Sequence, residues 1–424
     1  MNLSICSLYK FGLLLIILSL VAPKVSISGG FNITILDFFP LYFLLYILLI
    51  MLNKKKLKLD KRNTKLLVIF LSVAIIMLLS TFHGFFLFQD FLGFIKSISQ
   101  FYRRFIILIL YPLFILISLC NNLNLLNFFS RYFIYSTIIT GLLGLSINFI
   151  DYIRTFYLNY IASSKQVFLF GLYRNMGFIG EASYFADIIV FSLVLLFIQR
   201  NIYSRIKFFI IVVLLILLLV STVSKSAIIS IIISLLIILF IYIINTFLQG
   251  KRRFKVDISF ASIVLSVFVI SIILFFYIKA YTEQILTLAK SSFQQRSQVM
   301  WIDFLDIFFK HDSALLFGFG FKGLKSYLGF AGAHNQYLGF LIDFGFIFSA
   351  YFFIVFFFLI PIYVYQNISR RYKYFILFIV LYLSTQSFVH EPLYHFQVLG
   401  AYITIFISIV KMRKENVFKT CLNS

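Results

Sequence analysis

The sequence predicts an all-α polytopic membrane protein, a single integral membrane domain over residues 1–424 with about 12 transmembrane helices. The chain is 62% hydrophobic and only 12% charged, and its mean hydropathy is +1.03. A soluble core cannot hide this much apolar surface, so the solvent of the chain is a lipid bilayer. Because lipid-exposed backbone must satisfy its own hydrogen bonds, the long apolar runs predict helices rather than the short alternating strands of a barrel.

Twelve apolar segments mark the expected helices. They cover residues 11–28, 33–52, 66–82, 105–120, 132–150, 182–199, 206–222, 226–247, 258–278, 336–360, 373–390 and 395–411. The first segment is short enough for a signal peptide, but it lacks a small-x-small cleavage site. We therefore interpret it as an uncleaved first membrane helix.

Basic loops predict the orientation of these helices. Lys and Arg number 37 against 14 Asp and Glu, which gives a net charge of +23. Every strongly basic loop follows an even-numbered expected helix, at residues 53–65, 199–207, 249–255, 367–373 and 411–415. Since positive residues hold loops in the cytoplasm, both termini are expected there. Any remaining positive charge would suit an anionic substrate on the other face, whereas nucleic acid is not expected because no soluble basic domain exists to bind it.

The longest external loop covers residues 279–335, between expected helices 9 and 10. It is expected to be partly helical, because the stretch 294–312 has an apolar face at helical spacing. That face consists of Trp301, Ile302, Leu305, Phe308 and Phe309. The stretch is too short and too charged to span a bilayer, so we expect a helix that lies on the outer membrane surface or caps the bundle.

The residues offer little support for a metal or a nucleotide. Three cysteines, at 6, 120 and 421, lie too far apart for a disulfide framework or a metal-binding spacing. His390, Glu391 and His395 share an external loop, but Pro392 interrupts them and the signal for a metal is weak. The glycines of FGFGFKG (317–323) lack the strand and helix of a phosphate-binding loop. We expect them to let the backbone turn tightly and approach a bulky substrate.

Positive residues on the external side are informative, because topology does not require them there. Arg174 precedes the helix expected at 182–199, Lys225 lies in the turn between the next two helices, and Arg296 begins the surface helix. Each alone is compatible with a side chain that reaches a lipid headgroup. Together they would suit a lipid diphosphate, whose oxygens accept charge-assisted hydrogen bonds from guanidinium and ammonium groups.

Glu181 lies seven residues after Arg174, so a continuous helix would place both on one face. Gly177 and Gly180 make that continuity doubtful. Two interpretations stay open for Glu181: an ion-pair partner that orients Arg174, or a catalytic or acceptor-binding carboxylate.

His334 and Asn335 stand where the helix expected at 336–360 enters the membrane. A neutral imidazole there is a candidate general base for a hydroxyl nucleophile. It would equally hydrogen-bond a headgroup or a loop carbonyl. Asn335 would orient the ring or bind a sugar hydroxyl.

Four segments in this order resemble the bacterial O-antigen polymerase and O-antigen ligase superfamily. They are RNMGFIGEASYFA (174–186), STVSKSA (221–227), RSQVMWIDFLDIFFKHDSALLFGFGF (296–321) and AHNQYL (333–338). The resemblance covers residues 174–345, and the outer helices match only in hydropathy. It implies a multi-pass protein of the bacterial cytoplasmic membrane, surrounded by membrane lipids, with its active site on the external face.

The resemblance also implies roles for individual residues. Two cations would bind the diphosphate of an undecaprenyl-diphosphate-linked oligosaccharide with help from a third, namely Arg174 and Lys225 with Arg296. His334 would be the catalytic base, with Glu181 a second catalytic candidate. The acceptor or sugar would be positioned by Asn335 and Tyr337. One position departs from the family, because lysine stands at 225 where an arginine is usual, and lysine lacks the bidentate fork.

The implied reaction is polymerisation of lipid-linked repeat units into a surface polysaccharide such as O-antigen, capsule or exopolysaccharide. It would need no metal or other cofactor, because the lipid-diphosphate bond supplies the energy. A flippase and a chain-length regulator are the partners that the family implies. Two alternatives stay open: a ligase that transfers finished chains to lipid A core or another acceptor, and, from another class, a transporter of lipid-linked oligosaccharide.

Overall fold

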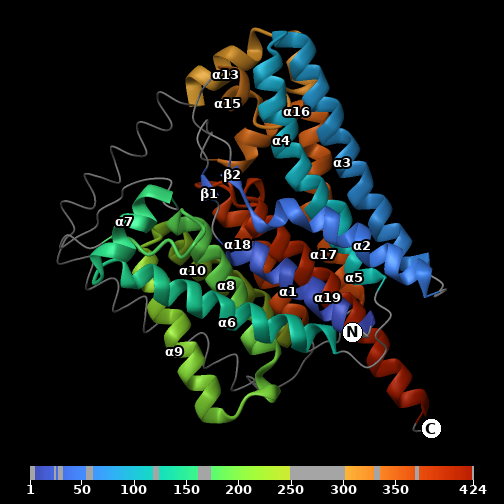
Figure 1. The fold of residues 1–424 in the computed structure, drawn as a ribbon, viewed down its shortest axis with the longest axis vertical. Helices are drawn as coiled ribbons and strands as arrows, with labels where there is room; N and C mark the ends of the chain where they lie inside the picture. The colour runs from blue at the N-terminus through green and yellow to red at the C-terminus, as the bar shows by residue number, and fades with distance from the viewer. Residues whose placement is uncertain are drawn as a thin grey trace.

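The computed structural model describes residues 5–22, 25–26, 32–53, 61–117, 124–160, 173–248, 301–328, 335–367 and 372–422. These residues form a bundle of helices (Figure 1). The described part also contains a minimal antiparallel pair of strands, β1 (Val25–Ser26) and β2 (Asn32–Ile33), in which Val25 lies opposite Ile33.

The helices of the first half of the chain run to residue 160. They are α1 (Ile5–Val21), η1 (Ile35–Phe38), α2 (Phe39–Leu52), α3 (Lys61–Phe88), α4 (Phe91–Phe105), the π-helix η2 (Ile106–Leu110), α5 (Tyr111–Leu116), α6 (Leu125–Ser146) and α7 (Asp151–Tyr160).

The second half begins with α8, which the loop 173–181 precedes. Its helices are α8 (Ala182–Ile198), η4 (Arg200–Ile202), α9 (Arg205–Thr222), α10 (Lys225–Leu248), α13 (Trp301–Phe309), α14 (Asp312–Phe317), α15 (Gly323–Leu328), α16 (Gln336–Phe353), the π-helix η6 (Ile354–Leu359), α17 (Ile360–Asn367), α18 (Lys373–Gln386), η8 (Pro392–Tyr394) and α19 (Phe396–Leu422).

The helical membrane architecture expected from the sequence is confirmed. Seven helical stretches in the described part are long and apolar enough to cross a membrane: 35–52, 64–88, 91–116, 125–146, 205–222, 225–244 and 336–366. Four shorter apolar helices cover 6–21, 182–198, 373–386 and 396–410. Together they coincide with all the expected segments except 258–278, which lies outside the described residues. The total of twelve spans and the orientation of the chain stay predictions.

One expected boundary was wrong. The sequence predicted a helix over 105–120, but the helix begins at Phe91 and continues through α4, η2 and α5. Hydropathy missed α4 because this helix has a polar face, which is buried against protein: Ser97 and Arg104 are 0% and 2% exposed. Ser97 Oγ donates to the Phe321 carbonyl at 2.8 Å. At one tip of the bundle α3 and α4 therefore run together beside α13 and α15 (Figure 1).

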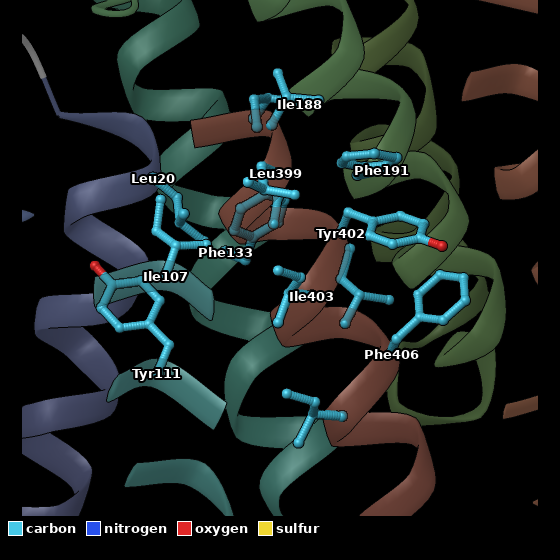
Figure 2. Packing of buried hydrophobic residues seen from close by; sticks show 14 of the residues in the cluster. Leu20, Ile107, Tyr111, Phe133, Ile188, Phe191, Leu399, Tyr402, Ile403 and Phe406 are labelled. Atoms are coloured by element: carbon cyan, nitrogen blue, oxygen red, sulfur yellow. The ribbon is translucent and has the colours of Figure 1, made fainter. Parts of the chain in front are cut away.

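The core is built around α19. Its first part, residues 396–409, is buried on every side, as expected for a helix that is apolar all round and lies inside a bundle. Leu399, Tyr402 and Ile403 of α19 lie among Ile107 of η2 and Phe191 of α8 (Figure 2). The last helix thus packs against both halves of the chain and holds them together.

The glycines of FGFGFKG serve a backbone contact within the protein. Gly318, at φ 71°, lies against the backbone of α16, where an added Cβ would be 2.2 Å from the Asp343 carbonyl oxygen. Gly345, at φ 70°, kinks α16 and lies against the Leu316 backbone in return. The expected close approach is confirmed, but its partner in the structure is another segment of the chain. Only glycine fits both conditions, a left-handed φ and no room for a Cβ.

In the described part of the expected surface helix, α13 ends at Phe309, and a second short helix, α14, follows from Asp312. Of its predicted apolar face, Phe308 is fully buried against Phe319 and Phe346, at 6.0 Å between ring centroids in each case. Ile302 and Phe309 are 51% and 56% exposed. The segment therefore caps α16 through one aromatic anchor rather than through the whole face.

Candidate functional site

Four loop ends that the sequence assigns to one membrane face meet in the structure. The Asn175 amide donates to the Ser221 carbonyl at 3.0 Å, which joins the loop before α8 to the end of α9. The Gln336 amide donates to the Ser387 carbonyl at 2.8 Å, which joins the start of α16 to the end of α18. The two pairs are linked because Ser230 of α10 donates to Gln386 of α18 at 3.2 Å.

Arg174 is fixed on the turn between α9 and α10. Its Nε donates to the Thr222 carbonyl at 3.0 Å and its Nη2 to the Val223 carbonyl at 3.3 Å. Val223 ends α9 in a left-handed conformation, with φ at 49°, which turns these carbonyls outward. Burial lowers the pKa of the Arg174 guanidinium, and the Glu181 charge partly offsets that shift. The guanidinium is thus held by neutral carbonyls and keeps its positive charge.

Asn175 holds the same loop in place through hydrogen bonds to two helices. It is fully buried, and its Nδ2 donates to the Gly141 carbonyl of α6 at 3.1 Å and to Ser221 Oγ of α9 at 2.9 Å. Its Oδ1 accepts from the Gly177 amide at 3.0 Å. The position of Arg174 is therefore fixed by its neighbour through two membrane helices.

Lys225 lies near Arg174 in the structure. It is the first residue of α10, and its side chain is exposed. The Arg174 charge acts on the Lys225 ammonium, so the two cations are close enough to repel each other. Two neighbouring cations that a protein keeps together are a suitable site for an anion with two phosphate groups.

Glu181 lies at the N-cap position of α8, in extended conformation. The loop from Arg174 to Glu181 is not helical, and Gly177 and Gly180 both have positive φ. The two charged residues nevertheless interact, because the Glu181 carboxylate favours the charged form of Arg174. The structure thus brings them together by a turn rather than by the shared helix face that the sequence offered.

Asn335 and Tyr337 have structural partners. Asn335 Oδ1 caps α16 by accepting from the Leu338 amide at 3.0 Å, and its Nδ2 donates to the Phe388 carbonyl at 3.1 Å. The Tyr337 hydroxyl donates to the Ser384 carbonyl at 2.9 Å. Both side chains hold the start of α16 against the end of α18, and the predicted role of each in positioning a sugar stays a prediction. His334 and Arg296 lie outside the described residues.

A buried polar network that sequence reasoning did not assign lies beneath these loops. Asp187 of α8 is 0% exposed and accepts from the Tyr382 hydroxyl at 2.5 Å and from Gln386 Nε2 at 3.2 Å. Gln386 in turn accepts from Ser230. A polar residue inside an apolar helix is the signal that would have indicated such a network.

A second network joins the glycine-rich segment to the loop between α18 and α19. Asp343 of α16 accepts from the amides of Lys322 and Gly323, at 2.6 and 3.2 Å, and from the Tyr394 hydroxyl at 2.7 Å. Burial and the Asp343 charge raise the pKa of Tyr394 well above its usual value, so the phenol stays protonated and donates. Arg104, fully buried in α4, donates to the Tyr394 carbonyl from the other side.

The loop between α18 and α19 also packs on α8. The Tyr184 ring lies between the imidazoles of His390 and His395, at centroid distances of 4.2 and 3.9 Å. Within the described part of the chain, no group of three His, Cys, Asp or Glu residues is placed to hold a metal ion.

The comparison with known families bears on the segment that carries Lys225. Residues 210–353 match the family model described as O-antigen ligase. This segment is therefore similar to the O-antigen ligase family. The resemblance inferred from the motifs is thereby confirmed for this segment, and it points to a function of the O-antigen ligase or polymerase type. No curated protein matches the chain.

Proposed function

We propose that the chain polymerises undecaprenyl-diphosphate-linked oligosaccharide repeat units at the outer face of the bacterial cytoplasmic membrane. The observation that supports this most directly is the pairing of Arg174 with Lys225 at the loop end of the bundle. The main-chain carbonyls of the α9–α10 turn that hold Arg174 are neutral, so they fix the guanidinium without cancelling its charge. The family match includes Lys225 and the whole of that helix turn.

The proposed chemistry is displacement at an anomeric carbon. A bond forms between an acceptor hydroxyl oxygen and the anomeric carbon, and the bond from that carbon to the diphosphate oxygen breaks. The lipid diphosphate leaves with the electron pair, and Arg174 and Lys225, assisted by Arg296, stabilise its charge. His334 takes the acceptor proton as general base. Because the acceptor attacks in a single displacement from the face opposite the diphosphate, the anomeric configuration inverts. Binding both substrates in one orientation would contribute much of the rate.

In this proposal Glu181 has a role secondary to His334. Its carboxylate favours the charged form of Arg174, which keeps the cation ready for the diphosphate. Asn335 and Tyr337 hold the α16 entrance in place beside His334 through their bonds to Phe388 and Ser384. Membrane lipids surround the site, and a flippase and a chain-length regulator would supply substrate and set product length.

A ligase is the second candidate, because the matching family model carries that description. It would use the same cations for the same donor and differ only in the acceptor. A transporter of lipid-linked oligosaccharide would instead place its charged residues near the bilayer midplane. Arg174 lies in the loop before α8 and Lys225 at the start of α10, which favours an enzyme.

The test is transfer in vitro with the purified full chain. Undecaprenyl-diphosphate repeat units from its own host are added, and products are resolved on a gel for wild type, His334→Ala and Arg174→Ala. The matched control is Arg205→Ala, an exposed arginine at the opposite end of α9. A ladder made by wild type and the control, and lost in both site variants, supports the polymerase. Transfer of finished chains to a supplied acceptor without a ladder indicates the ligase, and lipid movement across liposomes without transfer indicates the transporter.

A further inference from the structure

The loop between α18 and α19, residues 387–395, is attached to the start of α16 on several sides. The Gln336 amide donates to the carbonyls of Ser387 and His390, at 2.8 and 3.2 Å. The Leu393 amide donates to Gln336 Oε1 at 2.8 Å. Asn335 Nδ2 donates to the Phe388 carbonyl, as described above. This loop therefore forms a fixed wall at the mouth of α16, next in space to the residue that follows His334 in the chain.

Glu391 is the carboxylate of that wall. An added Cβ at Gly339 would lie 3.1 Å from Glu391 Oε1, so the carboxylate lies against the second turn of α16. Gly339 gives it room to approach, because any larger residue would meet Glu391 and Tyr394. The Glu391 residue is half-buried.

The Glu391 charge also reaches the other side of the site. It acts on Tyr184 of α8, on which the Glu181 charge acts as well. Tyr184 thus lies within reach of both carboxylates, one at the start of α8 and one in the wall beside α16. The diphosphate cations lie on the Glu181 side, because Glu181 interacts with Arg174. Glu391 lies on the α16 side, against Gly339.

A buried donor marks the same place. Gln336 is 0% exposed, and its Nε2 has no hydrogen-bond acceptor among the residues that the structure describes. Its Oε1 is already used by the Leu393 amide. A buried polar atom of this kind usually has a partner in the working protein. A hydroxyl-rich ligand at the mouth of α16 would supply acceptors as well as donors.

We infer that Glu391 binds hydroxyl groups of the acceptor sugar, in a carbohydrate subsite that Glu391 forms with the first two turns of α16. This inference rests on the proposed function and adds the acceptor side to it. An ionised carboxylate has room for about four hydrogen bonds, so it accepts from two neighbouring sugar hydroxyls beside its protein contacts. Charge-assisted bonds of this kind are stronger than neutral ones and favour one orientation of the sugar.

Two measurements on the full chain in detergent test the subsite. The first is steady-state transfer, with the KM of the acceptor and the KM of the lipid-linked donor determined separately. The second is calorimetric binding of the soluble repeat-unit oligosaccharide released from the host's own surface polysaccharide. The variants are Glu391→Ala and Glu391→Gln, with Val389→Ala of the same loop as the matched control. Val389 is 39% exposed and carries no polar side chain.

Glu391→Ala is expected to raise the acceptor KM and weaken oligosaccharide binding by at least about tenfold, the usual effect of losing a hydrogen bond to a charged group. The donor KM and the thermal midpoint should change little. Glu391→Gln keeps one acceptor oxygen, so its acceptor KM and its oligosaccharide affinity should lie between those of wild type and Glu391→Ala. This variant keeps the test valid if Glu391→Ala does not fold. Val389→Ala should match wild type in both measurements.

The result that overturns the inference is oligosaccharide binding by wild type that both Glu391 variants retain unchanged. Failure of wild type to bind the oligosaccharide overturns it too. A donor KM that rises as much as the acceptor KM places Glu391 on the diphosphate side and contradicts the assignment. Failure of the proposed function can be told apart from failure of this inference. In the first case wild type transfers no sugar, whereas binding of the oligosaccharide is measured without any transfer.

Discussion

Arg174 Nε donates to the Thr222 carbonyl at 3.0 Å, across 48 residues of chain. This bond attaches the loop before α8 to the end of α9. A second bond, from Arg174 Nη2 to the Val223 carbonyl, fixes the plane of the guanidinium. The orientation of this cation, and not merely its presence, is therefore set by the helix turn beneath it.

Replacing Arg174 by lysine keeps the positive charge but removes the guanidinium group, which can donate two parallel hydrogen bonds. Lysine cannot hold the Thr222 carbonyl and present two parallel donors to a phosphate at the same time. We expect the transfer rate of Arg174→Lys to fall by about 10- to 100-fold, with the donor KM raised. Arg205→Lys is the control, and a rate for Arg174→Lys equal to that of wild type would argue against a role in diphosphate binding.

The ion pair between Asp37 and Arg103 should contribute to stability. Arg103 Nε and Nη2 donate to Asp37 Oδ1 and Oδ2, both at 2.9 Å, and the two side chains are only 22% and 9% exposed, respectively for Asp37 and Arg103. Asp37→Ala removes the Asp37 carboxylate from this mostly buried guanidinium, at a cost of about 1–3 kcal/mol. The apparent thermal midpoint in detergent measures this.

Asp151→Ala is the matched control for that pair. Asp151 pairs with Arg154 one helical turn away, but it is 88% exposed. Exposed pairs contribute little because water screens both charges. The midpoint of Asp151→Ala should stay at the wild-type value, and an equal fall in both variants would contradict the argument from burial.

Asp187 should contribute to the stability of the protein, although it lies in a short apolar helix. Asp187→Ala leaves the Tyr382 hydroxyl and Gln386 Nε2 without their buried acceptor, each at a cost of about 1–3 kcal/mol. Asp187→Asn keeps one acceptor oxygen, so its loss of stability should be smaller than that of Asp187→Ala. Thermal midpoints of the two variants are compared with that of Asp306→Ala, an exposed carboxylate on α13. An alanine variant as stable as the asparagine variant would show that the network contributes nothing.

Gly345→Ala should disrupt the contact between α16 and the glycine-rich segment. The new Cβ would lie 2.4 Å from the Leu316 backbone, and φ is 70°, a strained conformation for any residue with a side chain. We expect a loss of about 1–3 kcal/mol or more. Gly400→Ala is the control, because its Cβ meets the flexible end of the Leu20 side chain and its φ is not positive. Equal midpoints for both variants would contradict this explanation.

The orientation of the bundle can be tested by cysteine labelling in intact cells. In a background without Cys6, Cys120 and Cys421, Val389→Cys should react with a membrane-impermeant maleimide, because its loop is predicted to face outward. Arg205→Cys, at the other end of the bundle, should react only after the membrane is permeabilised. The reverse pattern would invert the predicted topology and place the candidate site in the cytoplasm.

The sequence alone determined where the apolar helices lie. Hydropathy is a local property of the chain, and lipid requires each span to satisfy its own backbone, so eleven helical stretches could be placed without knowing their neighbours. The alternation of loops also predicted that Arg174 and Lys225 lie on one face of the membrane. The amphipathic helix α4 escaped this reasoning, because its polar face is buried by protein rather than by lipid.

Only the tertiary structure decided which polar groups meet. Asp343 and Tyr394 lie 51 residues apart in the chain and share a hydrogen bond, and Glu391 lies against Gly339 across a helix boundary. Nothing local in the sequence specifies such partners, because a buried polar group is satisfied by whichever donor or acceptor the packing brings to it. The glycines at 318 and 345 show the same limit. Their residue type indicated a close approach of the backbone. Only the packed structure showed that Gly318 approaches the backbone of α16 and that Gly345 approaches the backbone of the segment before Gly318.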